Sequence, residues 1–290
     1  MGETKIRVRQ MQRSDLKAVM QIKKAENWNQ TQEDWLFLLR SNPEYCLVAL
    51  IKNQVIGTVT AINYQNKVAW IGMMLVAIDF RGMGVSKLLI NTVIHKLKDC
   101  ASIKLDATPV GIPVYKKLGF VKEYEISRMV STNLHIIDDN QQGGTIYNLS
   151  PLSESELSNI ASLDASLFGV NRSDLFRFLL GSRKEICLQI KEENQLKGYV
   201  LGRNGSNYIQ IGPLMTYSTP LAQKLLYVVF ESLKDQALVI DVLSDKAELK
   251  EWLLSLGFIH QRSFSRMHLK SNGYAGKTET QYAISGPELG

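Results

Sequence analysis

The chain has 290 residues, of which 45% are hydrophobic and 21% charged, a composition typical of a globular protein with room for two domains. No apolar run approaches the roughly 18 residues of a membrane helix, so we expect no membrane-spanning segment. The net charge of +6 lies in residues 1–140, which contain 19 Lys and Arg against 13 Asp and Glu. Because this excess charge forms no basic clusters interleaved with aromatic residues, it does not favour binding to nucleic acid. It is compatible with a small ligand that carries phosphate.

The first residues, MGETKIRVRQMQ, have no apolar core of the kind found in a secretory signal. We therefore expect a cytoplasmic protein, although export by another route would leave no such mark. Two helices are predicted next, and the loop between them holds Trp28 and Asn29.

Residues 45–64 and 67–78 are rich in β-branched and apolar side chains around an Asn-Gln turn, which predicts an antiparallel meander. Residues 85–100 then have the apolar periodicity of a helix. A short strand (SIKLDAT) and a helix (PVYKKL) that ends at Gly119 follow. The predicted fold is therefore α+β, a mostly antiparallel sheet flanked by helices.

The same series of residues occurs a second time. Cys46-Leu, Asn53-Gln54 and Gly57 recur 141 residues later as Cys187-Leu, Asn194-Gln195 and Gly198, and the Leu-Gly-Phe and Ser-Arg-Met motifs after residue 117 recur after residue 255. An ordered series of this kind indicates duplication. We expect one domain in residues 1–140 and a second in 145–290, with a linker near DDNQQGGT (138–145).

The stretch IDFRGMGVSKLL (78–89) joins a predicted strand to a predicted helix. It lacks the third glycine of a dinucleotide-binding fingerprint and the GK[ST] of a Walker A loop. A plain turn with a helix cap is the simplest alternative. However, Gly82 and Gly84 permit close backbone approach, helix-start amides favour anions, and Arg81 adds a positive charge, as a pyrophosphate site requires.

Cysteines and histidines do not suggest a metal site. The three cysteines lie in apolar surroundings without CxxC spacing, and the four histidines form no HxxxH pair. We interpret the cysteines as buried, reduced thiols and expect no metal.

The stretch LVAIDFRGMGVSKLL, followed by PVYKKLGF, resembles the GNAT superfamily of acyl-CoA-dependent N-acyltransferases. Its signature, Gln/Arg-x-x-Gly-x-Gly/Ala, corresponds to Arg81-x-x-Gly84-x-Ser86, with serine as a departure in the last place. The duplicated layout, together with NWNQTQEDW, LDATP and the terminal YAISGPELG, is similar to tandem bacterial GNAT proteins. The resemblance implies two tandem GNAT folds, acetyl-CoA as cosubstrate, and direct attack of a primary amine on the thioester in a ternary complex.

The resemblance also implies site residues. Tyr115, four residues before Gly119, takes the general-acid position, with an amphipathic helix residue as the simpler alternative. Trp28 and Asn29 would line the acceptor pocket, with packing of Trp28 between the two helices as the alternative. The general base has only weak candidates, Asp106 and Glu26. The cofactor-binding residues would be Met74, Leu75, Val76, Arg81, Gly82, Met83, Gly84, Val85 and Ser86.

The second copy lacks both loop glycines and has Leu253 at the tyrosine position. It is therefore expected to be degenerate, and it could complete the acceptor pocket, hold the first domain or bind a protein partner. The predicted activity is N-acetyl transfer to a small-molecule or protein amine, with nucleic acid and membrane not expected as partners. An acyl-CoA-binding sensor without turnover is the alternative, and a tRNA-dependent peptidyl transferase is disfavoured by the intact first loop and the neutral second half.

Overall fold

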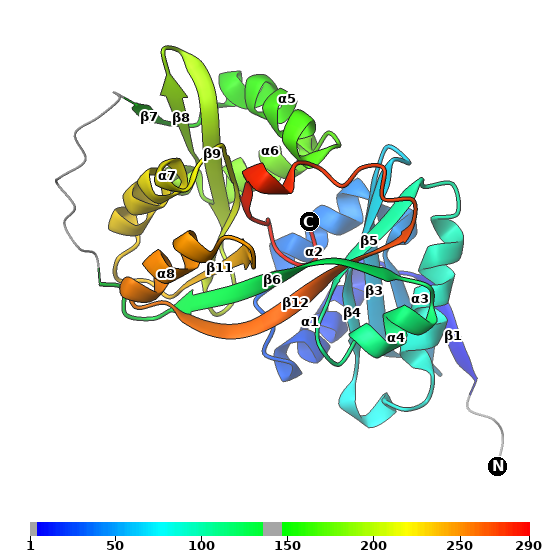
Figure 1. Ribbon diagram of the computed structural model, residues 1–290. Coiled ribbons are helices and arrows are strands. Elements are labelled where there is room, and N and C mark those ends of the chain that lie inside the picture. The colour runs from blue at the N-terminus through cyan, green and yellow to red at the C-terminus, as the bar shows by residue number, and fades with distance from the viewer. Residues whose placement is uncertain (1–4, 136–146) are drawn as a thin grey trace.

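The computed structural model describes residues 5–135 and 147–290; the predicted linker lies outside the described residues. These residues form a 13-stranded mixed sheet, flanked by helices, in which two strand pairs are parallel and the others antiparallel (Figure 1). The strand order is β1-β2-β3-β4-β5-β12-β6-β11-β13-β10-β9-β8-β7. The predicted α+β class is confirmed.

The two halves repeat the same order of elements. The first contains β1 (Ile6–Gln10), α1 (Leu16–Ala25), α2 (Gln32–Ser41), β2 (Leu47–Ile51), β3 (Gln54–Tyr64), β4 (Val68–Val76), α3 (Val85–Lys96), β5 (Ser102–Ala107), α4 (Ile112–Lys117) and β6 (Val121–Ser131). The second contains β7 (Asn148–Pro151), α5 (Leu157–Phe168), α6 (Ser173–Ser182), β8 (Leu188–Glu192), β9 (Gln195–Arg203), β10 (Ile209–Thr216), α7 (Thr219–Ser232), β11 (Leu238–Leu243), α8 (Ala247–Ser255) and β12 (Ile259–Lys270), and ends with an additional strand, β13 (Gln281–Ala283).

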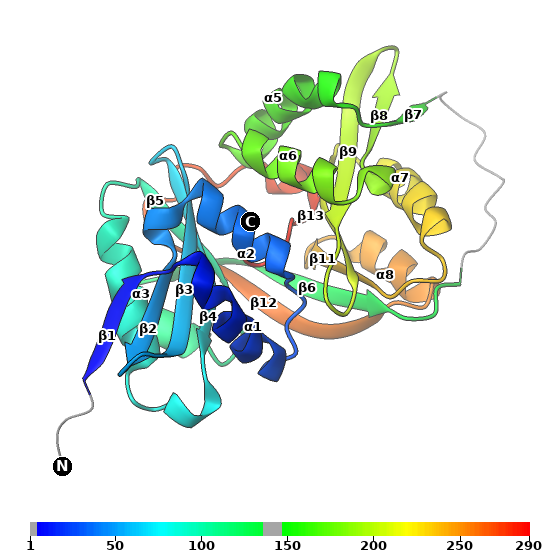
Figure 2. The same ribbon diagram turned by 180° about the vertical axis from the view of Figure 1, so that it is seen from behind.

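The halves exchange their equivalent long strands. β12 of the second half lies between β5 and β6, and β6 of the first half lies between β12 and β11 (Figures 1 and 2). The repeated Ser-Arg-Met motif stabilises this exchange. Arg128 on β6 makes a bidentate ion pair with Asp241 on β11, and Arg266 on β12 makes the equivalent pair with Asp106 on β5. Each arginine therefore compensates a buried carboxylate of the other half.

Helices cover both faces of the sheet. α1 and α2 pack on the first half and α5 and α6 on the second, and these four helices share one apolar core in which Phe37 stacks on Phe178 with ring centroids 4.5 Å apart. α3 packs on the opposite face of the first half, and α7 and α8 on that of the second. Within 5–135 and 147–290, no helix combines the length and apolarity needed to cross a bilayer.

Local sequence explains where key helices begin. Thr31 and Asp34 form a capping box at the start of α2, in which each side chain accepts a hydrogen bond from the other residue's backbone amide. α3 begins directly after Gly84, whose φ of +79° favours glycine, and it buries Val85, Leu89 and Val93. These two helix starts lie at the two ends of the site described next.

Candidate functional site

The first half contains an opening between two parallel strands. β4 and β5 pair at Val68–Trp70 and Ser102–Lys104, and their register pairs end there. A shift in the β3–β4 register and the φ of +49° at Met73 mark the bend of β4 away from β5. The strands then line an open cavity together with residues from α4, β6, β12 and the loop before α2.

The glycine loop lies beyond the end of β4. Gly82 and Gly84 both have positive φ, and a Cβ on either glycine would meet no atom within 4 Å. Among the described residues, the backbone amides of residues 82–87 have no hydrogen-bond acceptor. Six consecutive free amides in an exposed loop and first helical turn form an anion-binding surface that a phosphate group fits.

Arg81, which was predicted at this anion site, is exposed and already partnered. Its guanidinium forms an ion pair with Glu26 at the end of α1, and its Nε donates to the carbonyl oxygen of Val76 at 3.3 Å. Its charge remains next to the amide surface, but the Glu26 carboxylate partly neutralises it.

The open edge of β4 presents backbone groups to the cavity. The amide of Ala77 donates to the carbonyl of Ile56 on β3 at 2.9 Å. Because successive amides of a strand point to opposite edges, the amide of Val76 faces the open edge. Met74 lines the cavity on the same strand.

Tyr115 on α4 also lines this cavity. Its ring packs edge-to-face against Phe120, with centroids 5.7 Å apart, and its hydroxyl has no hydrogen-bond partner among the residues described. Burial raises the pKa of Tyr115 to about 12, so the phenol remains protonated at neutral pH. It is therefore available as a proton donor.

The two residues predicted to contact an acceptor have different positions. Trp28 is half-buried and lines the cavity. Asn29 is buried and is not among the lining residues; its side chain accepts from the amides of Asn207 and Tyr208 and donates to the carbonyl of Tyr208. Asn29 thus attaches α1 and α2 to the β9–β10 turn of the second half.

The two weak candidates for a general base both form ion pairs. Asp106 is fully buried and pairs with Arg266 through both carboxylate oxygens, and Glu26 pairs with Arg81. These geometries assign both carboxylates to ion pairs.

Sequence reasoning missed the contribution of residues 281–290. Pro287 and Glu288 line the first-half cavity, and the segment is held by hydrogen bonds from Tyr64 to Leu289 and from Trp70 to Pro287. Gly72 on β4 makes this approach possible, because a Cβ there would lie 2.7 Å from the Cα of Glu288. The terminal YAISGPELG contributed only to the resemblance, and the recurrence of Ile71-Gly72 as Ile211-Gly212 does not indicate a contact with a segment 216 residues away.

The corresponding opening of the second half is filled. β10 and β11 also pair in parallel only at their beginnings, Ile209–Ile211 with Leu238–Ile240. β13 then lies between them and pairs with both strands through Ala283. Two residues, Tyr217 and Ser218, separate β10 from α7, so no glycine loop intervenes.

Other chemistry is not evident in the described parts of the chain. No group of three or more His, Cys, Asp and Glu side chains suited to a metal ion occurs there. Cys46, Cys100 and Cys187 are buried, as interpreted from the sequence, and form no disulfide. Burial raises the pKa of Cys46 and of Cys187 to about 12, which disfavours a reactive thiolate at either position.

Comparison with known families agrees with this duplicated architecture. Residues 8–120 match the family described as "Acetyltransferase (GNAT) family", and residues 160–283 match the one described as "Acetyltransferase (GNAT) domain". Together the two matches cover most of the chain.

Two curated proteins are similar in sequence. The "Uncharacterized N-acetyltransferase YitH" of Bacillus subtilis is 23% identical over 188 residues, 65% of each chain. The "Holothin acyltransferase" of a Pseudoalteromonas species is 24% identical over 201 residues, which are 69% of this chain and 66% of that protein. The matched segments thus span just under two thirds of the length of either relative.

A solved structure from Pyrococcus horikoshii, described as a candidate acetyltransferase, matches all of this chain and 97% of its own, with a TM-score of 0.80 and 23% identity. At this identity, the similarity supports the fold of both halves and their arrangement.

Proposed function

Because the chain belongs to the GNAT acetyltransferase superfamily, with one such domain in each half, we propose that it is an acetyl-CoA-dependent N-acetyltransferase. The acceptor is a primary amine that attacks the thioester directly in a ternary complex. The first half, residues 1–140, performs the chemistry, and the second, residues 145–290, supports the acceptor site. The observation that carries this proposal is the row of unpaired amides at residues 82–87 beside the open edge of β4.

The residues present fit acetyl-CoA. Its pyrophosphate requires several donors and little bulk, which the amides of Gly82–Ser86 and the positive φ angles of the two glycines provide. Its pantetheine amides require a strand edge, which Met74 to Val76 provide. When bound, the cosubstrate supplies the activated acetyl group.

The chain's own groups would stabilise charge on both sides of the reaction. The amide of Val76 is a fixed donor for the oxygen on which negative charge develops, an interaction worth roughly 3 kcal/mol in comparable oxyanion holes. The protonated phenol of Tyr115 can donate to the departing sulfur. The filled opening between β10 and β11 argues against a second cofactor site.

The anion site is tested by Gly84→Asp, which places a side chain and a negative charge among the free amides. Gly181→Asp is the matched control, because a Cβ at Gly181, on α6, also meets no atom within 4 Å. We expect calorimetry to detect acetyl-CoA binding to the parent and the control, and at least a 100-fold loss of affinity in Gly84→Asp. Equal affinity in all three proteins would refute the placement.

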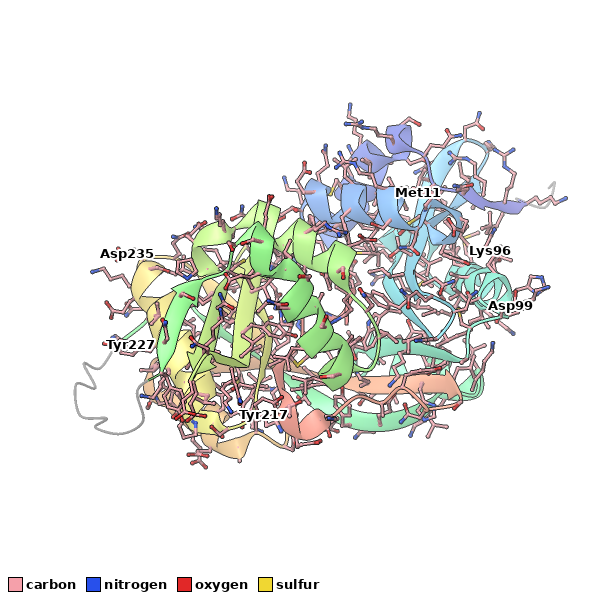
Figure 3. All side chains as sticks on the ribbon, turned by 90° about the horizontal axis from the view of Figure 1, so that it is seen from above. Met11, Lys96, Asp99, Tyr217, Tyr227 and Asp235 are labelled. Carbon is pink, nitrogen blue, oxygen red and sulfur yellow. The ribbon has the colours of Figure 1, made fainter. Side chains whose placement is uncertain are left out.

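The acid is tested by Tyr115→Phe. Free-thiol release with an amine library should fall roughly 100-fold in kcat, the lower end of general-acid effects, with little change in acetyl-CoA affinity. Tyr217→Phe is the control, since Tyr217 is 53% exposed and lies on the second half (Figure 3). Unchanged turnover would exclude Tyr115 from the mechanism, and acetyl-CoA binding without thiol release by the parent would favour a sensor over an enzyme.

A further inference from the structure

The cavity contains one charged side chain without a counterion. Four side chains that line it are charged at neutral pH: Asp106 pairs with Arg266, Arg128 with Asp241, and Glu288 with Arg203. The fourth, Arg262 on β12, has no ion pair or hydrogen bond to any residue in the described ranges. Burial and the neighbouring Arg128 lower the pKa of Arg262. An uncompensated guanidinium in a cavity is a favourable site for an anion.

The duplication indicates that the fold does not require this arginine. Arg262 lies opposite Arg128 on the neighbouring strand, and the equivalent pair in the other copy is Tyr124 opposite Arg266. There the Tyr124 hydroxyl accepts a hydrogen bond from Arg266. Two cations directly opposite each other on adjacent strands are destabilising, whereas the Tyr–Arg pair is favourable. The second copy therefore has a less stable combination at the position that faces the cavity.

Two hydrogen-bond acceptors, Gln30 and Glu288, line the same cavity. Gln30 is buried, and its Nε2 donates to Glu288 at 2.8 Å, which fixes the orientation of the amide. Its Oε1 is a buried acceptor to which no residue in the described ranges donates a hydrogen bond. Glu288 carries a carboxylate beside it. An unsatisfied acceptor next to a carboxylate suits the N–H groups of an amine.

We propose that the acceptor is a primary amine that also carries a carboxylate, as an amino acid does. Arg262 binds the carboxylate, and Gln30 Oε1 with Glu288 binds the amine. Trp28 and Phe264 line the same cavity and would contact the side chain. A monoanion fits better than a phosphate dianion, because Glu288 lines the same space and repels the second charge. The kinetic test of this inference rests on the proposed function, because it measures acetyl transfer.

The kinetic test compares L-phenylalanine with phenethylamine, which lacks only the carboxylate. In the parent we expect kcat/KM to be about 10- to 100-fold higher for the amino acid, the range for a charge-assisted hydrogen-bonded pair. Arg262→Gln should abolish this preference by lowering kcat/KM for L-phenylalanine towards the value for phenethylamine. Arg262→Tyr, which copies the other half, should do the same and fold at least as stably. The control is Arg177→Gln, at an exposed position on α6.

A binding test does not depend on turnover. Phenylacetate is titrated by calorimetry into the parent, Arg262→Gln and the Arg177→Gln control, with phenyl phosphate in parallel. Binding of phenylacetate to the parent and control, but at least 10-fold more weakly to Arg262→Gln, supports the proposal. No binding, equal binding by Arg262→Gln, or preference for phenyl phosphate overturns it. If the parent acetylates phenethylamine and L-phenylalanine equally well, this inference is overturned and the proposed acetyl transfer stands. If the parent does not bind acetyl-CoA, the proposed function itself is contradicted.

Discussion

Replacing Arg266 by Met should destabilise the first half of the protein, although Arg266 belongs to the second half in sequence. Arg266 lies on β12, but its guanidinium is the counterion of Asp106 on β5, with both N–O distances 2.9 Å, and it lies 4.3 Å from the ring centroid of Trp70. Both side chains of the ion pair are almost completely buried, at 2% and 0% exposure. Methionine has similar length and no charge, so Asp106 would remain buried without a cation.

The expected loss in the free energy of unfolding is about 3–5 kcal/mol, the usual result of removing one partner of a buried pair. That is a large part of the 5–15 kcal/mol typical of a whole domain. The matched control is Arg177→Met, because the Arg177–Asp174 pair is exposed, at 67% and 79%, and should contribute less than about 1 kcal/mol. The double variant Asp106→Asn/Arg266→Met should recover at least about 1 kcal/mol, since no uncompensated carboxylate remains.

Urea denaturation followed by tryptophan fluorescence measures this effect in the relevant half. Three of the four tryptophans, Trp28, Trp35 and Trp70, belong to the first half. We expect their transition to move to lower urea in Arg266→Met. A shift no larger than that of Arg177→Met, or no recovery in the double variant, would refute the reasoning that the exchanged strand stabilises the first half through this pair.

Two further predictions concern the second half and the 281–290 segment. A hydrogen bond from Lys191 is the main cause that lowers the pKa of Glu156 to about 2, below the unfolded value of 4.5, so Glu156→Gln should cost about 1 kcal/mol of stability at pH 7. Urea midpoints should show this cost vanishing as the pH falls from 4.5 towards 2, and a pH-independent cost would contradict the reasoning. Gly72→Ala should displace Glu288, lower the stability by about 1–3 kcal/mol and raise KM for the amine without changing acetyl-CoA affinity. The control Gly181→Ala should leave KM for the amine unchanged. Normal amine kinetics in Gly72→Ala would show that residues 281–290 do not form the acceptor site.

The predicted elements agree well with the structure where their causes are local. The apolar runs around Asn53-Gln54 predicted a meander, which β2, β3 and β4 form with the turn one residue earlier, and the periodicity after Gly84 predicted α3. The glycine loop was also recognisable, because positive φ at Gly82 and Gly84 is a preference of the residue itself. The roles of the loop residues and of Tyr115 remain predictions that the experiments above test.

Asn29 and Glu288 illustrate what local patterns do not contain. Asn29 follows Trp28 directly, yet it binds backbone groups of the β9–β10 turn almost 180 residues away, while Trp28 lines the cavity. Glu288 lies in the terminal YAISGPELG, which gives no sign of a contact with the other half, and its position depends on Gly72 there. A hydrogen-bond partner so distant in sequence leaves no periodic or spacing signal.

The sequence alone determined that the chain contains two copies of one α+β unit and that only the first has a glycine loop, because strand alternation, helix periodicity and glycine conformation act over a few neighbouring residues. Only the tertiary structure decided that the copies exchange strands, that β13 fills the second opening, and that residues 287 and 288 enter the first. Strand pairing depends on edges brought together over more than a hundred residues. The buried Arg–Asp pairs that stabilise the exchange satisfy each other only once both halves have folded around them.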